Sequence, residues 1–402
     1  MKDESKINSK KPIVVITGGG SGGHTVTAIS VIDELNRRFP ELVEDIVYIG
    51  GLRGMEGEKN SQSVEERVVR EKGIAFVGIR SGKLQRRVAL STVIGLFGVV
   101  GGVIDAIRFF QTNDVRFVFS TGGYVTVPVC FAAWLKKVRV VIHEQTTRVG
   151  LSNKLSSIFC QKILLGFEEA AEYVPRKKAV FVGNTIRREL IEEELWPRDF
   201  VMKIRRMKAQ TPNYPMVLIA GGGQGAHLFN SIVMMALKSL VSNFNIVVLT
   251  GDNKINRDFD KLVTETRKLS REHQHRILLL KYASAQELGV LYRNADVFVG
   301  RGGALMISEV GALRIPSVLV PIPWVTRNEQ YHNAKVVENI GLAKIVPEGV
   351  LSPEILFQEI LRMVTKVKGG MLKVDDERRE TIFIKDASRR IVDEIEPFLR
   401  SV

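Results

Sequence analysis

Cysteine is scarce in this chain: its 402 residues include two, Cys130 and Cys160. Both stand in apolar segments without metal-ligand spacing, so we expect buried thiols in a reducing compartment and neither a disulfide nor a zinc site. The sequence also lacks a D-x-D motif positioned to hold a metal ion, and it lacks any recognisable nucleic-acid-binding module. We therefore predict no metal, no cofactor and no nucleic acid partner.

We also expect neither a secretory signal nor a membrane-spanning segment. The N-terminal residues MKDESKINSKK are polar and lead directly into a strand. The run Val88–Ile104 has seventeen uncharged residues, the lower limit for a span, but it contains glycines and lies between strands of one domain. A helix lying at the membrane interface, preceded by Lys83, Arg86 and Arg87, fits the composition better. A buried domain helix is the alternative.

What the chain does have is apolar and basic residues. Hydrophobic residues make up 45% of it and charged residues 25%, which is typical of a globular protein with an ample core. Its length favours two domains. The net charge of +14 indicates an anionic partner, such as a phosphorylated substrate or an anionic membrane surface.

Glycine is abundant, with 35 residues that cluster in turns between strands and helices. A predicted strand at Ile13–Thr17 leads into GGGSGGH at 18–24, and a helix follows from about Thr25 to Phe39. The acidic residue that closes the next strand of a dinucleotide-binding fold is missing, because Asp45–Ile49 is followed by two glycines. This absence argues against NAD.

The same order recurs later in the chain. A strand at Met216–Ala220 leads into GGGQGAH at 221–227 and a helix, so His227 occupies the place of His24. The repeat predicts two similar doubly wound α/β halves with parallel sheets. We place the N-terminal domain at residues 1–184, with 384–402 packing back on it, a linker at 185–215 and the C-terminal domain at 216–383. Ligands of such folds bind at the carboxyl ends of the strands, here in a cleft between the halves.

The richest polar cluster lies between residues 296 and 334. A strand at Val297–Gly300, a glycine loop and a helix at Ala304–Leu313 together predict an anion site, because unpaired backbone N–H groups at the helix start converge there. Glu309 inside that helix is placed to accept hydrogen bonds from a ribose diol, and Gln330 opens the next helix. The combination predicts a nucleotide-sugar site; an ordinary βαβ unit with a solvated helix is the alternative.

Nine short segments then occur in the order found in one enzyme family. They are GGGSGGH at 18–24, IRSGKLQRR at 79–87, GGYVTVP at 122–128, HEQT at 143–146, GLSNK at 150–154, GNTIR at 183–187, GGGQGA at 221–226, RGGALMISE at 301–309 and NEQYHNA at 328–334. From about residue 12 to 400, the chain resembles the MurG-type glycosyltransferases of peptidoglycan synthesis, glycosyltransferase family 28.

The resemblance implies a GT-B fold of two Rossmann-like domains with an interdomain cleft. It implies an inverting hexosyltransferase that moves N-acetylglucosamine from UDP-N-acetylglucosamine to a polyprenyl-pyrophosphate-linked acceptor, lipid I, to give lipid II. Such an enzyme works at the cytoplasmic face of the cell membrane as a peripheral, monotopic protein. A related GT-B glycosyltransferase with another lipid or glycan acceptor, or an inactive nucleotide-sugar-binding membrane scaffold, is the alternative.

The resemblance also implies roles for individual residues. His24 would be the general base, assisted by Glu144; a histidine that only hydrogen-bonds the loop is the alternative. The donor-binding residues would be Arg187, Gly223, Gln224, Asn230, Tyr282, Arg301, Ala304, Leu305, Glu309 and Gln330. The acceptor diphosphate would meet Gly20, Ser21, Gly22, Gly23, Gly122, Gly123, Tyr124, His143 and Thr146.

Several positions depart from the family pattern. Serine is usual where Gly223 and Gly302 stand, threonine at Met306 and asparagine at Thr146. Arginine is usual at the position of His227, so no catalytic role is assigned to that histidine. Backbone contacts to a diphosphate survive a change from serine to glycine, whereas the changes at Met306 and Thr146 bear on the fit of the sugar and the acceptor.

Overall fold

A computed structural model describes residues 13–20, 22–52, 63–80, 90–222, 226–252 and 255–400, with only the backbone at residues 64, 90–98 and 326. The predicted site residues Ser21, Gly223 and Gln224 lie outside the described residues, and so do Lys83, Arg86 and Arg87. The chain divides into two compact units. Unit 1 comprises Met1–Thr185 and Ile384–Val402, and unit 2 comprises Ile186–Phe383.

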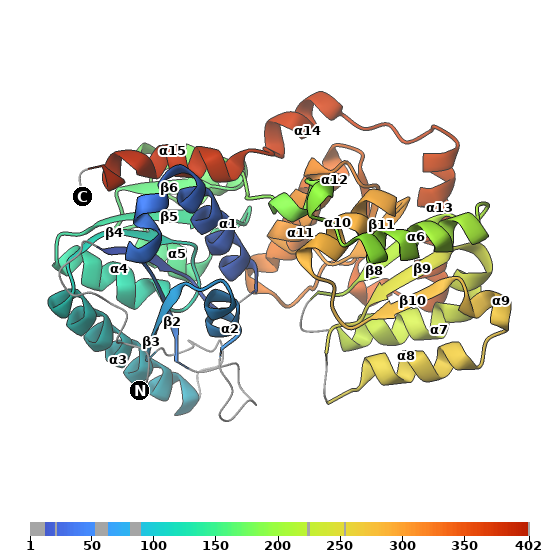
Figure 1. Cartoon of the computed structure of the whole chain (residues 1–402), viewed down its shortest axis with the longest axis horizontal. Helices are drawn as coiled ribbons and strands as arrows, with labels where there is room; N and C mark the ends of the chain where they lie inside the picture. Colours follow the sequence, from blue (N-terminus) through green and yellow to red (C-terminus); the bar gives the residue numbers. More distant parts are fainter. Residues whose placement is uncertain are drawn as a thin grey trace. The chain divides into compact units, whose positions relative to one another are not determined.

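Unit 1 is built on a parallel sheet, which has seven strands in the described part of the chain, in the order β3-β2-β1-β4-β5-β6-β7 (Figure 1). The strands are β1 (Ile13–Thr17), β2 (Ile46–Gly51), β3 (Ala75–Ile79), β4 (Val115–Ser120), β5 (Arg139–Glu144), β6 (Lys162–Leu165) and β7 (Ala179–Phe181). All five residues of β1 are buried, as expected for a central strand covered on both faces.

The helices of unit 1 cover both faces of this sheet. They are α1 (Gly22–Arg38), α2 (Val64–Glu71), α3 (Leu90–Thr112), α4 (Thr126–Leu135), α5 (Leu151–Ser156) and α15 (Ala387–Leu399). Short 3₁₀ turns are η2 (Pro40–Asp45), η3 (Glu168–Tyr173) and η4 (Arg176–Lys178). Val15 faces α3 and α4, whereas Val14 and Ile16 face α1 and α15, so alternate residues of one strand enter two separate cores.

Unit 2 repeats this plan with a parallel sheet of order β10-β9-β8-β11-β12-β13 among its described residues. Its strands are β8 (Met216–Ala220), β9 (Asn245–Leu249), β10 (Ile277–Leu280), β11 (Val297–Gly300), β12 (Ser317–Leu319) and β13 (Ala343–Ile345). Its helices are α6 (Arg198–Gln210), α7 (His227–Asn243), α8 (Asp258–Arg267), α9 (Arg271–Gln274), α10 (Ala285–Asn294), α11 (Ala304–Ala312), α12 (Glu329–Asn339), α13 (Pro353–Lys368) and α14 (Asp376–Ile382). Its 3₁₀ turns are η5 (Arg188–Leu190), η6 (Glu193–Leu195), η7 (Thr326–Asn328) and η8 (Glu348–Val350).

In both sheets the strand order reverses beside the first strand. In unit 1, β1 lies between β2 and β4, and in unit 2, β8 lies between β9 and β11, with every pairing parallel. Loops that leave two neighbouring strands in opposite directions open a crevice at the carboxyl edge of such a sheet. The predicted α/β class with doubly wound parallel sheets is confirmed.

The segment predicted as a linker, 185–215, carries regular structure. Helix α6 occupies its centre, Phe200 and Ile204 are buried, and Lys208 Nζ donates to the carbonyl of Asn294 at 3.0 Å. From Ile186 onward this segment therefore belongs to unit 2.

The run Val88–Ile104 falls largely within α3, whose described backbone is helical from Leu90. In the parts of the chain that the structure describes, no helix is both long and apolar enough to cross a membrane.

Candidate functional site

In unit 1 the loops after β1 and β4 pack against each other, backbone to backbone. Gly19 N donates to the carbonyl of Gly122 at 3.1 Å. Gly123 has φ +93°, and a Cβ there would lie 1.9 Å from the carbonyl oxygen of Gly19. Only glycine fits such an approach, so the glycines bring both loops to the point where the strand order reverses.

His24 stands at the third position of α1, beside these loops. Its Nδ1 lies 2.7 Å from the carbonyl oxygen of Thr121, at the end of β4, and Gln145 Nε2 donates to the same oxygen at 2.9 Å. A carbonyl only accepts, so Nδ1 carries the proton and Nε2 is the basic nitrogen. Burial lowers the pKa of His24, although the charge of Glu144 opposes the shift. The imidazole is therefore neutral and able to take a proton.

Glu144, the last residue of β5, is buried and holds the loop that follows it. Its carboxylate accepts from the backbone N–H groups of Thr146 at 2.9 Å and Gly150 at 3.1 Å, and from Asn153 Nδ2 at 3.0 Å. The Thr146 hydroxyl lies 2.8 Å from the same carboxylate. Glu144 thus influences His24 through its charge and shapes the loop through its hydrogen bonds.

His143 was expected to bind the acceptor, but its side chain is fully buried. Its Nε2 lies 3.0 Å from the carbonyl oxygen of Gly183, and burial lowers its pKa to about 4. The alternation of side chains along β5 explains the difference, because it turns His143 into the core. Tyr124 is half-buried, and its hydroxyl donates to Glu65 Oε1 at 3.0 Å.

In unit 2, Glu309 lies on α11 and its side chain is 3% exposed. Arg187 holds the carboxylate with two hydrogen bonds, Nε to Oε1 at 2.8 Å and Nη2 to Oε2 at 3.0 Å. The hydroxyl of Tyr292 lies 3.5 Å from Oε2. Oε2 accepts from both Arg187 and Tyr292, whereas Oε1 accepts from Arg187 alone and retains a lone pair that a ribose hydroxyl could use. Arg187 and Glu309, both predicted to bind the donor, are thus paired with each other.

Arg301, the residue after β11, is also buried and paired. Its Nη1 donates to the carbonyl of Val320 at 3.0 Å and to Glu348 Oε2, and its guanidinium lies 5.2 Å from the ring centre of Phe229 on α7. The Glu348 carboxylate neutralises its charge. Arg301 therefore ties the start of α7 to the loop before α11, and its guanidinium is not presented to solvent.

The first turn of α11 is where the sequence predicts an anion site. Gly303 precedes the helix and has no side chain to cap it, so the N–H groups around Ala304 and Leu305 face outward. Gln330 Oε1 accepts from the N–H groups of Gly302 at 3.3 Å and Ile322 at 3.1 Å. A Cβ on Gly302 would lie 2.2 Å from the carbonyl of Gln330, which accounts for glycine at this position.

Asn230 and Tyr282 complete the described donor set. Asn230 is buried, and its amide donates to the carbonyl of Thr250 at 2.9 Å and to Asp258 Oδ2 at 3.0 Å. Its amide nitrogen thus supports Asp258, and its predicted contact with the donor stays a prediction. Tyr282 is 56% exposed, and its hydroxyl accepts from the N–H of Asp252 at 3.2 Å.

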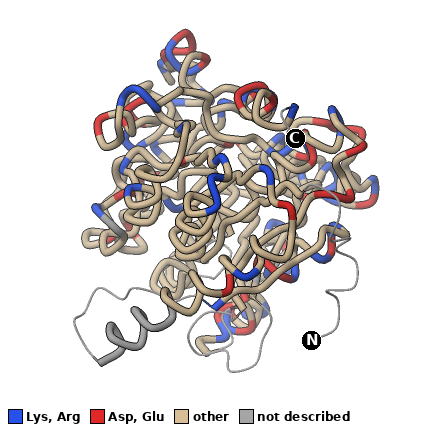
Figure 2. Tube along the Cα trace, turned by 90° about the vertical axis from the view of Figure 1, so that its left-hand side faces the viewer, with Lys and Arg blue, Asp and Glu red and all other residues tan. Residues whose placement is uncertain are grey.

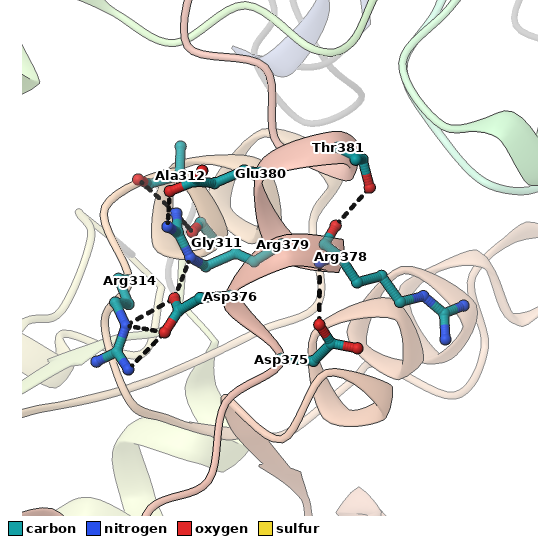
Figure 3. Close-up of polar contacts among 9 residues, drawn as sticks. All are labelled: Gly311, Ala312, Arg314, Asp375, Asp376, Arg378, Arg379, Glu380 and Thr381. Atoms are coloured by element: carbon teal, nitrogen blue, oxygen red, sulfur yellow. Dashed lines mark hydrogen bonds and ion pairs between the residues drawn. The ribbon is translucent and has the colours of Figure 1, made fainter.

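The far end of α11 is anchored by α14 (Figure 3). Arg379 is buried, and its Nη1 points at the carbonyls of Gly311 and Ala312 at 3.4 and 3.5 Å. Asp376 bridges Arg379 and Arg314 with hydrogen bonds of 2.8–3.0 Å, which hold the pKa of its carboxyl well below the usual range. This network fixes the helix that carries Glu309.

Comparison with known proteins identifies the family. The glycosyltransferase family 28 N-terminal domain matches residues 14–165, and its C-terminal domain matches residues 216–390. A UDP-N-acetylglucosamine–N-acetylmuramyl-(pentapeptide) pyrophosphoryl-undecaprenol N-acetylglucosamine transferase from Lachnoclostridium phytofermentans is 33% identical over 349 residues, 86% of this chain and 89% of the relative. The chain belongs to glycosyltransferase family 28.

Two further similar proteins align with almost the whole chain. A transferase of the same name from Acetivibrio thermocellus is 30% identical, over 96% of this chain and 98% of the relative. The crystal structure of Acinetobacter baumannii MurG matches with a TM-score of 0.66 at 22% identity, over 96% of this chain and 99% of that one. This structural likeness shows that the family 28 chain has the GT-B fold.

The structure adds residues of this family 28 chain that the sequence did not single out. Five are hydrogen-bond partners of predicted site residues: Glu65, Asn153, Asp258, Tyr292 and Glu348. The sixth, Gln145, donates to the Thr121 carbonyl that also accepts from His24. Gln145 and Asn153 stand inside recognised motifs, which was the available signal. The others come from separate strand ends and helices, and only folding brings them to the sites.

Proposed function

We propose that this protein transfers N-acetylglucosamine from UDP-N-acetylglucosamine to lipid I, with inversion at the anomeric carbon, and so makes lipid II for peptidoglycan synthesis. The observation that carries the proposal is that transferases named for this reaction are 30–33% identical over 86–96% of the chain. In this proposal the carboxyl edge of the unit 1 sheet binds the acceptor, and the carboxyl edge of the unit 2 sheet binds the donor.

The acceptor chemistry belongs to the edge of unit 1. His24 Nε2 is the basic nitrogen of a neutral imidazole and would take the proton from the attacking hydroxyl of the muramyl sugar. The adjoining glycine loops around Gly20 and Gly123 would offer backbone N–H groups to the acceptor diphosphate, whereas the N–H of Gly122 donates to the Ser120 hydroxyl at 3.3 Å. Glu144 stabilises the imidazolium that forms.

The donor chemistry belongs to the edge of unit 2. The first turn of α11, around Ala304 and Leu305, would bind the diphosphate and stabilise the negative charge on departing UDP. Glu309, oriented by Arg187, would accept hydrogen bonds from the ribose hydroxyls. The amide nitrogen of Gln330 would bind the sugar, because its carbonyl oxygen is already engaged with the backbone.

A lipid-linked acceptor requires the protein to meet a membrane, and we assign this to the face formed by α3, α4 and α5. Large apolar side chains are exposed there, among them Val100 at 54%, Trp134 at 52% and Ile158 at 70%, and Lys136 and Lys137 follow α4. Figure 2 colours the charged residues along the described chain, and the sequence of α3 contains two of them, Asp105 and Arg108. This composition supports peripheral binding by apolar insertion and attraction to anionic lipid, which we place at the cytoplasmic face as part of the proposal.

One assay tests the reaction directly. The full-length protein is incubated with radiolabelled UDP-N-acetylglucosamine and a short-chain lipid I analogue, and lipid-linked disaccharide is measured. Product that disappears in His24→Ala supports the proposal. Transfer to another lipid or glycan, but not to lipid I, would assign a different acceptor, and donor binding without any transfer would indicate a scaffold.

The membrane face has its own test. Trp134→Asp with Ile158→Asp should lower co-sedimentation with anionic vesicles, whereas the matched control Trp324→Ala, an exposed tryptophan of unit 2, should not. Each basic residue near an anionic surface contributes about 1 kcal/mol, so Lys136→Glu with Lys137→Glu should weaken binding about 30-fold at low salt. Binding insensitive to all these changes would refute this assignment.

A further inference from the structure

The donor edge of unit 2 contains a histidine whose role remains open. His227 is the first residue of α7, and its Nδ1 lies 2.7 Å from Asp258 Oδ1. Asp258 is buried, and Asn230, also buried, donates its amide to the other carboxylate oxygen at 3.0 Å. The His227 side chain, by contrast, is 46% exposed. A buried carboxylate and amide thus fix the orientation of an imidazole that solvent can reach.

The hydrogen bond to Asp258 determines which ring nitrogen meets a ligand. A carboxylate accepts, so Nδ1 carries a proton, and among the described residues Nε2 has no hydrogen-bond partner. With both nitrogens protonated, the imidazolium would donate Nε2–H outward while Asp258 balances its charge. That arrangement suits an anionic oxygen at the start of α7, where the helix dipole also favours negative charge.

The fold places this imidazole at the donor edge. Helix α7 follows β8, and α11 follows β11, and these two strands are the neighbours between which the strand order reverses. Phe229, two residues after His227, stacks against the guanidinium of Arg301 in the loop before α11. The starts of the two helices therefore flank the same crevice.

The other predicted cations of this edge are already engaged. Arg187 is held by Glu309, and Arg301 by Glu348, in pairs whose carboxylates are 3% exposed. Both arginines are also more buried than His227, at 23% and 5% of the side chain against 46%. Of these three side chains, that of His227 is the most accessible to a phosphate.

We propose that His227 binds the diphosphate of a nucleoside-diphosphate donor through Nε2, and that Asp258 and Asn230 act as positioning residues for it. This inference rests on the proposed function, because it assumes that unit 2 binds the donor. It gives His227 a direct contact with the phosphate. It also explains why a buried aspartate and a buried asparagine hold an exposed ring in place.

The test compares UDP with uridine on the full-length protein. Calorimetry with UDP should show His227→Ala binding about 10- to 100-fold more weakly than wild type, the range for losing a hydrogen bond to a charged group. Uridine, measured by saturation-transfer NMR, should keep its affinity. His227→Arg should return UDP affinity to within about threefold of wild type. His275→Ala is the matched control. His275 precedes β10 at the amino end of that strand, so the change should alter the affinity for neither UDP nor uridine.

A double-mutant cycle separates positioning from general destabilisation. Asp258→Asn should weaken UDP binding less than His227→Ala, and the double variant should bind like His227→Ala alone, because Asp258 acts through the ring. Equal losses for UDP and uridine, or additive effects of the two changes, would overturn the inference. Wild-type affinity in His227→Ala would overturn it while leaving the proposed function intact, whereas a wild-type protein that does not bind UDP would overturn both.

Discussion

His143 makes the stability of unit 1 depend on pH in a defined direction. The side chain is fully buried at the end of β5, and its one recorded hydrogen bond, from Nε2, reaches the carbonyl of Gly183 at 3.0 Å. No described residue lies within hydrogen-bonding distance of its Nδ1. Protonation of Nδ1 would therefore place an uncompensated charge in the core, and burial lowers the pKa of His143 to about 4.

The sign follows from comparing the folded and unfolded chains. The folded pKa lies near 4 and the ordinary value is 6.5, so between these values the unfolded chain binds a proton that the folded chain does not. The contribution to stability is complete above pH 6.5 and is lost as the pH falls toward 4. At pH 5 the linkage relation gives a loss of about 2 kcal/mol in the free energy of unfolding of unit 1.

Hydrogen exchange measured by mass spectrometry can follow this loss in unit 1 alone. Peptides from β4 and β5 should lose protection between pH 7 and pH 5 in the wild type, after correction for intrinsic exchange. His143→Gln keeps a donor for Gly183 but does not titrate, so its protection should be flatter by about 2 kcal/mol over the same interval. Equal pH dependence in the two proteins would show that His143 titrates normally and that its burial does not control its pKa.

Three further outcomes follow from the sites. Glu309→Ala should weaken UDP binding by about 1–3 kcal/mol in calorimetry, because the ribose diol loses a charged acceptor; unchanged affinity would remove Glu309 from the ribose role. His24→Ala should lower turnover about a hundredfold or more with donor affinity kept, and the reverse pattern would refute its assignment as the base. Gly123→Ala should lower the free energy of unfolding of unit 1 by about 1–3 kcal/mol, because the new Cβ would meet the carbonyl of Gly19. Gly22→Ala is the control and should leave the free energy of unfolding nearly unchanged, because its Cβ meets nothing within 4 Å. Equal thermal denaturation of the two variants would contradict the packing argument.

The central strands of both sheets could be predicted because each is a continuous run of apolar residues with glycine at its end. Strands β8 and β11 have the bounds read from the sequence, Met216–Ala220 and Val297–Gly300. Helix α1 begins at Gly22, three residues before the predicted start, because glycine is a poor signal for a helix although the first turn tolerates it. Helix α6 was missed because six of its thirteen residues are charged and its buried residues are only two, Phe200 and Ile204.

The electrostatics of the sites were less predictable than their location. Glycine loops and strand ends identify the edge of a sheet, and the motifs place His24 and Glu309 there. Nothing near Arg301 in the sequence announces that Glu348 will neutralise it, because that carboxylate follows β13, 47 positions away. An arginine in a sequence motif therefore does not establish that a positive charge faces the ligand. The charge near a substrate also depends on residues that are distant in sequence and become neighbours only in the folded chain.

The two histidines of the repeat show how one plan can carry two chemistries. In unit 1, His24 donates Nδ1–H to a backbone carbonyl, which has no net charge, and burial lowers its pKa, so the ring stays neutral and can accept a proton. In unit 2, Nδ1 of His227 lies 2.7 Å from the Asp258 carboxylate, and the side chain is 46% exposed. In the roles proposed here, His24 takes a proton from the attacking hydroxyl and His227 binds the leaving diphosphate. Two histidines that match in the repeated motif would then differ in role because their hydrogen-bond partners differ, a carbonyl for His24 and a carboxylate for His227.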